Sequence, residues 1–192
     1  MSETAVRFAR HFHRGQRRDS DRAPFILHPL EVASLLYSSG ASDEVVAAGV
    51  LHDVVENTSV GLDQIEAIFG HRIASLVAAV TENPKIRSER ARKAALRMQV
   101  RGAGVDAAAI FAADKVAKVR ELRTRVAHAR LDGAPVPADV RKKLGHYRAS
   151  LRMLEQVLDG HSLVWKLRFE LEAFRAFPPG RPLRPVAHGG PA

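Results

Sequence analysis

Apolar side chains recur at helical spacing along almost the whole chain, and this periodicity restricts the fold more than any other feature. Between residues 43 and 56, for example, Val46, Val50 and Val54 share one helical face and can form a buried stripe. No segment shows the alternation of a half-buried strand, and we find neither an internal repeat nor a heptad array. The sequence therefore predicts an all-α fold.

Proline, glycine and capping residues divide this pattern into separate helices. Pro29 suits the first position of a helix, Ser42 and Asp106 are expected N-caps, and Gly70 is expected to end a short helix. A loop is expected between the first two helices, at residues 15–23. The expected helices span residues 3–14, 29–38, 43–56, 62–69, 72–81, 87–101, 107–131, 138–158 and 162–177.

Length and composition indicate one domain. The 192 residues can bury one core, so we expect a single domain at 1–177 and a disordered tail, rich in proline and glycine, at 178–192. No apolar run reaches the roughly 20 residues that cross a bilayer, and the first residues lack a secretory signal. The absence of cysteine excludes disulfides, zinc–thiolate sites and thiol nucleophiles. These features predict a cytoplasmic protein outside the membrane, either a monomer or a homodimer.

The formal net charge of +9 is unevenly distributed. Residues 1–84 hold 7 basic and 11 acidic side chains, whereas residues 85–130 hold 13 basic and 4 acidic ones. The first part suits cation ligands and the second a polyphosphate or nucleic acid, although solvated helix faces explain the basic segment equally well. Aromatic residues form only 6% of the chain, which leaves few for base stacking, so a nucleic-acid partner is not expected.

Four side chains, from three separated segments, have the chemistry of metal ligands: His28, His52, Asp53 and Asp114. A His-Asp dipeptide alone is weak, because chance predicts about half of one in such a chain. Each residue also has a plain structural explanation: His28 can cap a helix, His52 can be a core histidine, and Asp114 can pair with Lys118. Taken together, two imidazoles and two carboxylates favour a divalent cation such as Mn, Fe or Zn, which can acidify water and hold a phosphoryl oxygen.

Glu56 is the expected catalytic carboxylate beside this site. It follows His52 by four residues and Asp53 by three, so a continuous helix places it on their face, within reach of a metal-bound water.

The stretch from residue 13 to residue 122 resembles the HD-domain hydrolases of the RelA/SpoT type, especially the small stand-alone alarmone hydrolases. The resemblance implies a Mn-dependent enzyme, with Fe, Zn or Co as other possible ions, that removes the 3′-diphosphate from ppGpp or pppGpp. The matching motifs are His13-Arg14-Gly15-Gln16-Arg17-Arg18, Pro24 to Ala33 around His28-Pro29, Ala48 to Glu56 around His52-Asp53, Phe69-Gly70, Leu76-Val77 with Val80-Thr81, and Ala113-Asp114-Lys115 with Arg120-Glu121-Leu122.

Carried over by motif, His28, His52, Asp53 and Asp114 are the implied metal ligands. The resemblance also implies that Glu56 orients or deprotonates the attacking water. Arg17 and Arg18 match a basic pair that flanks the nucleotide base, and Tyr147 matches a substrate-contacting tyrosine. Several basic residues are expected to offset charge on the leaving diphosphate: Lys118, Arg17, Arg18 and one or more of Arg90, Arg92, Lys93 and Arg97.

Two positions depart from the family pattern. Asn57 stands where the family usually has aspartate, and an amide cannot act as a general base, although it can position water. Lys118 stands where asparagine is common, and its ammonium can contact a phosphate or pair with Asp114. Two alternatives therefore stay open: the same chemistry on an adenosine alarmone, nucleoside phosphate or cyclic nucleotide, and a degenerate, non-catalytic domain that binds a nucleotide or RNA.

Overall fold

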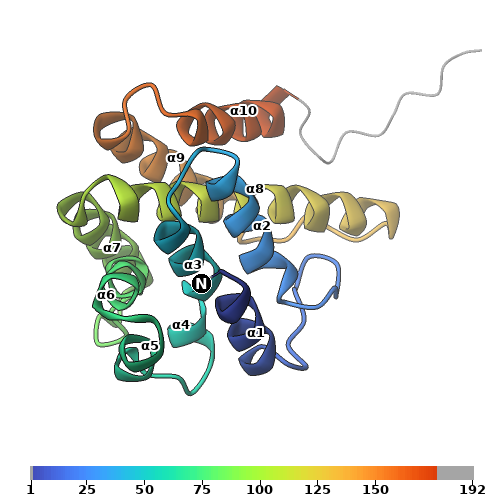
Figure 1. The fold of residues 1–192 in the computed structure, drawn as a ribbon. Coiled ribbons are helices and arrows are strands. Elements are labelled where there is room, and N and C mark those ends of the chain that lie inside the picture. Colours follow the sequence, from blue (N-terminus) through green and yellow to red (C-terminus); the bar gives the residue numbers. More distant parts are fainter. Residues whose placement is uncertain (1, 177–192) are drawn as a thin grey trace, which may run out of the picture.

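The computed structural model describes residues 2–176, which form an all-α bundle, as predicted (Figure 1). Outside the helices, one isolated antiparallel bridge joins Arg17 to Pro24. The expected tail at 178–192 lies outside the described residues. The helices are α1 (Ser2–Phe12), α2 (Leu27–Tyr37), α3 (Asp43–Leu51), α4 (Val54–Asn57), α5 (Leu62–Phe69), α6 (His71–Val80), α7 (Glu89–Ala103), α8 (Val105–Leu131), α9 (Val140–Val157) and α10 (Ser162–Ala176).

Helix α8 is the central element of the bundle. In Figure 1 it runs across the molecule, with α10 above it and α1, α4 and α5 below, and it packs against α2, α3, α6, α7, α9 and α10. Every residue from 107 to 117 is buried, and six of these eleven are alanines. Because small side chains surround this part of α8, neighbouring helices can pack closely against it on every side. Asp114 and Lys115 lie within this buried stretch, where charged groups need partners.

Close packing and ion pairs hold α2 against α3 and α8. A Cβ on Gly49 of α3 would lie 2.3 Å from Cδ1 of Leu36 in α2, so glycine permits this helix contact. Glu170 of α10 is buried and accepts hydrogen bonds from Arg120 and Arg123 of α8, at 2.8 and 2.7 Å. Arg120 also donates to Glu31 of α2 at 3.0 Å. These contacts fix the relative positions of the helices that carry His28, His52 and Asp114.

The continuous helix expected at 43–56 is wrong, because the chain turns at His52-Asp53. Helix α3 ends at Leu51, and α4 begins at Val54 after Asp53 adopts φ −94° and ψ −5°. The His52 Nδ1 atom is 2.7 Å from the Gly49 carbonyl oxygen, the acceptor that the Asp53 N–H would use in an unbroken helix. Neither proline nor glycine marks this break.

Other helix boundaries differ in smaller ways. Gly104 (φ 93°) is the N-cap of α8, whereas Asp106 lies in its first turn and forms an ion pair with Arg72 instead of capping. Pro29 is the third residue of α2 rather than the first, still within the turn where its missing N–H is tolerated. Ser42 does cap α3, accepting from the Val45 N–H at 3.5 Å, and Gly70 (φ 86°) does end α5. Within residues 2–176, no helix is both long and apolar enough to span a membrane.

Candidate metal centre

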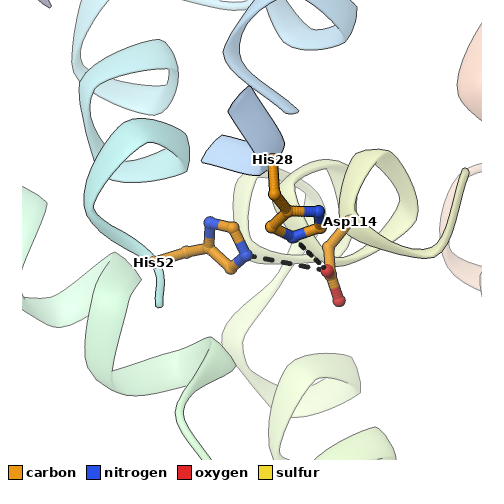
Figure 2. Close-up of side chains that lie close together, drawn as sticks. All are labelled: His28, His52 and Asp114. Atoms are coloured by element: carbon orange, nitrogen blue, oxygen red, sulfur yellow. Dashed lines mark ion pairs between the residues drawn. The ribbon is translucent and has the colours of Figure 1, made fainter. Parts of the chain in front are cut away.

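Three helices bring the expected ligands together in the core. His28 comes from the first turn of α2, His52 and Asp53 from the turn between α3 and α4, and Asp114 from the middle of α8 (Figure 2 shows three of them). The Asp114 Oδ1 atom is 3.2 Å from His28 Nε2 and 3.6 Å from His52 Nε2. The Asp53 Oδ2 atom is 3.4 and 3.3 Å from the same two nitrogens. All four side chains are buried.

Three of the converging atoms lack a hydrogen bond of acceptable geometry: Nε2 of His28, Nε2 of His52 and Oδ1 of Asp114. Buried polar atoms without a partner are rare and costly. These three lie within 4.8 Å of one another and form a group able to hold a metal ion. Two imidazole nitrogens and carboxylate oxygens are the donor set of borderline divalent cations. The residues present therefore fit a metal of this class.

The other ring nitrogens of both histidines have hydrogen-bond partners. His28 Nδ1 lies 2.7 Å from Glu121 Oε1, and His52 Nδ1 lies 2.7 Å from the Gly49 carbonyl oxygen. Both partners accept, so each Nδ1 carries a proton, and in the neutral ring, which is the form that binds a metal, Nε2 directs its lone pair to the centre. Metal-bound histidines are usually oriented in this way. Sequence reasoning gave Glu121 no role, although it lies seven residues after Asp114 on the same face of α8.

The electrostatics of the centre match a cation site. Burial alone would lower the pKa of His52, but the carboxylates of Asp53 and Asp114 raise it to about 10. Burial alone would raise the pKa of Asp53, but the charges of His52 and Lys118 hold it below its usual value. The pKa of Asp114 is likewise lowered, mainly by Lys115 and Lys118, against the effect of burial. Each carboxylate is thus stabilised as an anion by the positive charge around it.

Two lysines form ion pairs with the same aspartates that face the histidines. Lys118 Nζ is 3.0 Å from Asp114 Oδ1 and 3.9 Å from Asp53 Oδ1, so the Asp114–Lys118 ion pair, the structural alternative for Asp114, is formed. Lys115, which sequence reasoning gave no role, is buried and pairs with the other oxygen of Asp114. Its Nζ also lies 4.2 Å from the centre of the Phe111 ring. Asp114 therefore takes part in both the ion pair and the ligand cluster, and Lys118 contacts the same oxygen, Oδ1, that faces the two histidines.

Glu56 and Asn57 lie at the rim. Glu56 lines a small cavity together with His52, Asp53 and Asp114, and it accepts a hydrogen bond from the Glu82 N–H. Burial raises the pKa of Glu56 and the charge of Asp53 adds to the effect, against the lowering by that hydrogen bond. Asn57 is exposed, and its main-chain carbonyl accepts from Gln16 Nε2 at 2.9 Å.

A larger cleft of about 650 Å³ adjoins the centre. Lys115 and Lys118 line both this cleft and the small cavity, so they stand between the two. The cleft is also lined by Arg17, Arg18 and Tyr147, so the structure brings the four expected substrate-binding residues to one place. Of the basic residues expected to offset charge, Arg90, Lys93 and Arg97 line the cleft, whereas Arg92 pairs with Glu82 outside its lining.

The chain is similar in sequence to one protein family and to several named hydrolases. Residues 5–134 match the model of a protein family described as the HD domain. The chain is 50% identical over 78 residues to a probable guanosine-3′,5′-bis(diphosphate) 3′-pyrophosphohydrolase of Synechocystis, covering 41% of this chain and 10% of that protein. It is 44% identical over 92 residues to the mouse guanosine-3′,5′-bis(diphosphate) 3′-pyrophosphohydrolase MESH1, covering 45% of this chain and 51% of that protein. The chain thus spans about half, or much less, of the length of these relatives.

Two solved structures share the fold. One is a metazoan orthologue of SpoT, described as hydrolysing ppGpp, with a TM-score of 0.74 at 23% identity over 91% of this chain and 94% of that one. At this identity the likeness shows the fold alone. The other is a protein of Listeria monocytogenes, with a TM-score of 0.63 at 30% identity over 76% of this chain and 91% of that one.

Proposed function

This chain belongs to the HD-domain family, and on that premise we propose that it is a metal-dependent phosphohydrolase that removes the 3′-diphosphate from ppGpp or pppGpp. The observation that carries the proposal is the convergence of His28 Nε2, His52 Nε2 and Asp114 Oδ1, all buried and without good hydrogen bonds, beside a basic cleft. Relatives named as 3′-pyrophosphohydrolases support the choice of substrate.

His28, His52, Asp53 and Asp114 would hold the ion, for which we propose Mn²⁺, with Fe, Zn or Co as alternatives. When bound, such an ion supplies a water of lowered pKa and a positive charge beside a phosphoryl oxygen. The outer hydrogen bonds to Glu121 and to the Gly49 carbonyl keep the two imidazoles in the tautomer that can bind it.

Glu56 would accept the proton of the attacking water. Its raised pKa suits this task, because the carboxylate is then a stronger base than that of an ordinary glutamate. The water oxygen would then bond to the 3′-phosphorus and the bond from that phosphorus to the ribose 3′ oxygen would break. The ribose oxygen would keep the electron pair and take up the proton that the water lost, and the products are pyrophosphate and the nucleotide with a free 3′-hydroxyl. Asn57 would position the water through its amide without accepting a proton.

The cleft would hold the nucleotide. Arg18 is engaged by Asp21 and, at 3.9 Å, by Glu121, so we assign it to shaping the wall, whereas the exposed Arg17 would contact the base. Burial raises the pKa of Tyr147 to about 12, so its phenol stays protonated as a hydrogen-bond donor to the substrate. Lys118 would contact the phosphate next to the centre. A nucleotide substrate is consistent with the cytoplasmic location that the sequence predicts.

One observation favours a second candidate, a domain that binds nucleotides without hydrolysing them. The Lys118 ammonium lies 3.0 Å from Asp114 Oδ1, one of the atoms that would hold the ion. A positive charge at that point competes with a metal for the same oxygen.

A product assay separates the candidates. Purified protein with added Mn²⁺ is offered ppGpp, pppGpp, pppApp and GTP, with His52→Ala as the control. We expect pyrophosphate from ppGpp and pppGpp and none in the control. Release only from pppApp would assign an adenosine alarmone instead. No turnover of any nucleotide, in protein shown to contain metal, would contradict hydrolysis and support the binding domain.

A further inference from the structure

The cations of the cleft fall into two groups. Ten arginine and lysine side chains line it, and seven of them form an ion pair with a carboxylate. Among residues 2–176, no carboxylate pairs with the other three, Arg17, Arg90 and Arg97. Arg17 and Arg90 are exposed to water, which can hydrate their charges, whereas Arg97 is partly buried. A cation that is partly removed from water and has no anion beside it loses some of its hydration without compensation, so Arg97 differs from the other nine.

Arg97 is held by a histidine instead of by a carboxylate. Its NH1 group lies 2.9 Å from His146 Nδ1 of α9. A guanidinium can only donate, so Nδ1 accepts and the ring proton of the neutral imidazole is on Nε2. Burial, and then the charges of Lys115, Lys93 and Arg97, lower the pKa of His146 to about 3, which keeps the ring neutral.

The second ring nitrogen of His146, Nε2, has no hydrogen-bond partner within residues 2–176. His146 Nε2 is buried and makes no hydrogen bond among the described residues, although the residue lines the cleft. The pair therefore brings to the cleft wall the remaining N–H groups of a guanidinium and, beside them, a buried imidazole N–H that lacks an acceptor among the described residues. Phosphate oxygens accept from both kinds of donor, and a guanidinium binds them with two parallel hydrogen bonds.

We propose that Arg97 and His146 form a phosphate-binding subsite for a phosphate group of the nucleotide other than the one at the metal centre. This inference rests on the proposed function and adds to it a specificity-determining pair. Arg90, Lys93 and Arg97 recur at helical spacing on α7, so the subsite continues a basic face along that wall of the cleft. The bound group is a phosphate of the substrate's 5′-diphosphate or the outer phosphate of its 3′-diphosphate.

Binding of two small probes tests the subsite without turnover. Calorimetry measures the affinity of GDP, which carries a 5′-diphosphate, and of inorganic pyrophosphate, which mimics the 3′-group. We expect Arg97→Met to weaken one probe by about ten- to a hundredfold, as for loss of a charged hydrogen bond. The probe that loses affinity identifies the source of the phosphate. Arg101→Met is the matched control, because Arg101 is exposed on the same helix and does not line the cleft.

Two substitutions at His146 separate a contact from a purely structural role. His146→Asn keeps an acceptor near the position of Nδ1 but removes the Nε2–H donor. His146→Gln keeps a donor near the position of Nε2. We expect the Gln variant to bind the affected probe more tightly than the Asn variant. Arg97→Lys, which keeps the charge but not the planar fork, should fall between wild type and Arg97→Met. Melting temperatures show that the variants are folded.

The outcomes distinguish this inference from the proposed function. If wild type binds neither probe, or if Arg97→Met and Arg97→Lys bind both as wild type does, the subsite is wrong. Turnover of ppGpp with an unchanged KM in Arg97→Met would likewise refute the subsite alone. Arg97-dependent binding without turnover of any alarmone would refute the proposed hydrolysis and leave the subsite standing.

Discussion

The metal centre and the cleft beside it stabilise their charges in opposite ways. In the centre, buried acceptors and histidines meet, and each imidazole is oriented by one outer hydrogen bond. In the cleft, most cations are at least partly exposed and pair with carboxylates such as Glu89 and Asp139 from the surrounding helices. A buried charge has few alternative partners, whereas an exposed one can turn to water. We therefore expect substitutions of charged residues to have large effects in the metal centre and smaller effects in the cleft.

The largest effect should follow removal of the Asp114 carboxylate. Asp114→Ala removes the atom that lies 3.2 and 3.6 Å from the two Nε2 atoms, and it leaves Lys115 buried without its partner. We expect loss of bound metal and of hydrolysis to below detection, measured by elemental analysis and by the product assay. Full metal content in a folded variant would show that Asp114 is not a ligand.

Glu56→Gln should separate catalysis from metal binding. Losing a general base costs about 10²- to 10⁴-fold in kcat, while the metal content should stay unchanged because Glu56 lies at the rim. In the wild type, kcat should fall as the pH drops through the pKa of Glu56, because only the ionised form accepts a proton. Since that pKa is raised, the fall begins at a higher pH than for an ordinary glutamate. The same acidic limb in the variant would exclude Glu56 as the base.

Glu121→Gln tests whether the centre depends on its outer hydrogen bonds. The change removes the carboxylate 2.7 Å from His28 Nδ1 but keeps the size of the side chain. Such substitutions usually cost about 10- to 100-fold in metal affinity or activity. Titration with Mn²⁺ measures the affinity, and Glu31→Gln, which changes a carboxylate paired with Arg120 outside the centre, is the control. Equal affinity in both variants would contradict the role of Glu121.

Lys118 lies on the border between the centre and the cleft. Its substitution Lys118→Asn should therefore change the affinity for Mn²⁺ less than Glu121→Gln does. Removing the ammonium beside Asp114 and Asp53 leaves both carboxylates to the metal, so we expect Mn²⁺ to bind more tightly, by up to about fivefold. The gain is small because Lys118 keeps 34% of its side chain exposed. Weaker Mn²⁺ binding in this variant would mean that the lysine supports the ion instead of competing with it.

Asn57→Asp should have the smallest effect. Asn57 is exposed, and its main-chain carbonyl makes the bond to Gln16, so the substitution leaves that contact in place. We expect hydrolysis of ppGpp to be retained or to rise by a few fold, because a second carboxylate can then assist Glu56. If the variant loses an activity that the wild type has, the amide has a role of its own.

Helix positions followed largely from local sequence signals. Ser42 and Gly70 act where they were expected, because capping and positive φ depend on one residue and its neighbours. The four proposed ligands were also identified from the sequence. Histidine and aspartate within apolar stretches are expected to be buried, and a buried polar or charged group needs a partner whatever the fold. Asp106 shows the limit: a distant ion pair with Arg72 replaced the local cap.

By itself, then, the sequence determined the all-α class, most helix boundaries and the residue types that could bind an ion. Only the tertiary structure decided the break at His52-Asp53, the outer partners of the two histidines and the pairing of Arg97 with His146. Local spacing predicts contacts within a turn or two, but His28 and Glu121 are 93 residues apart. Contacts over such separations depend on how ten helices pack within residues 2–176, and that packing carries no signature in any short segment.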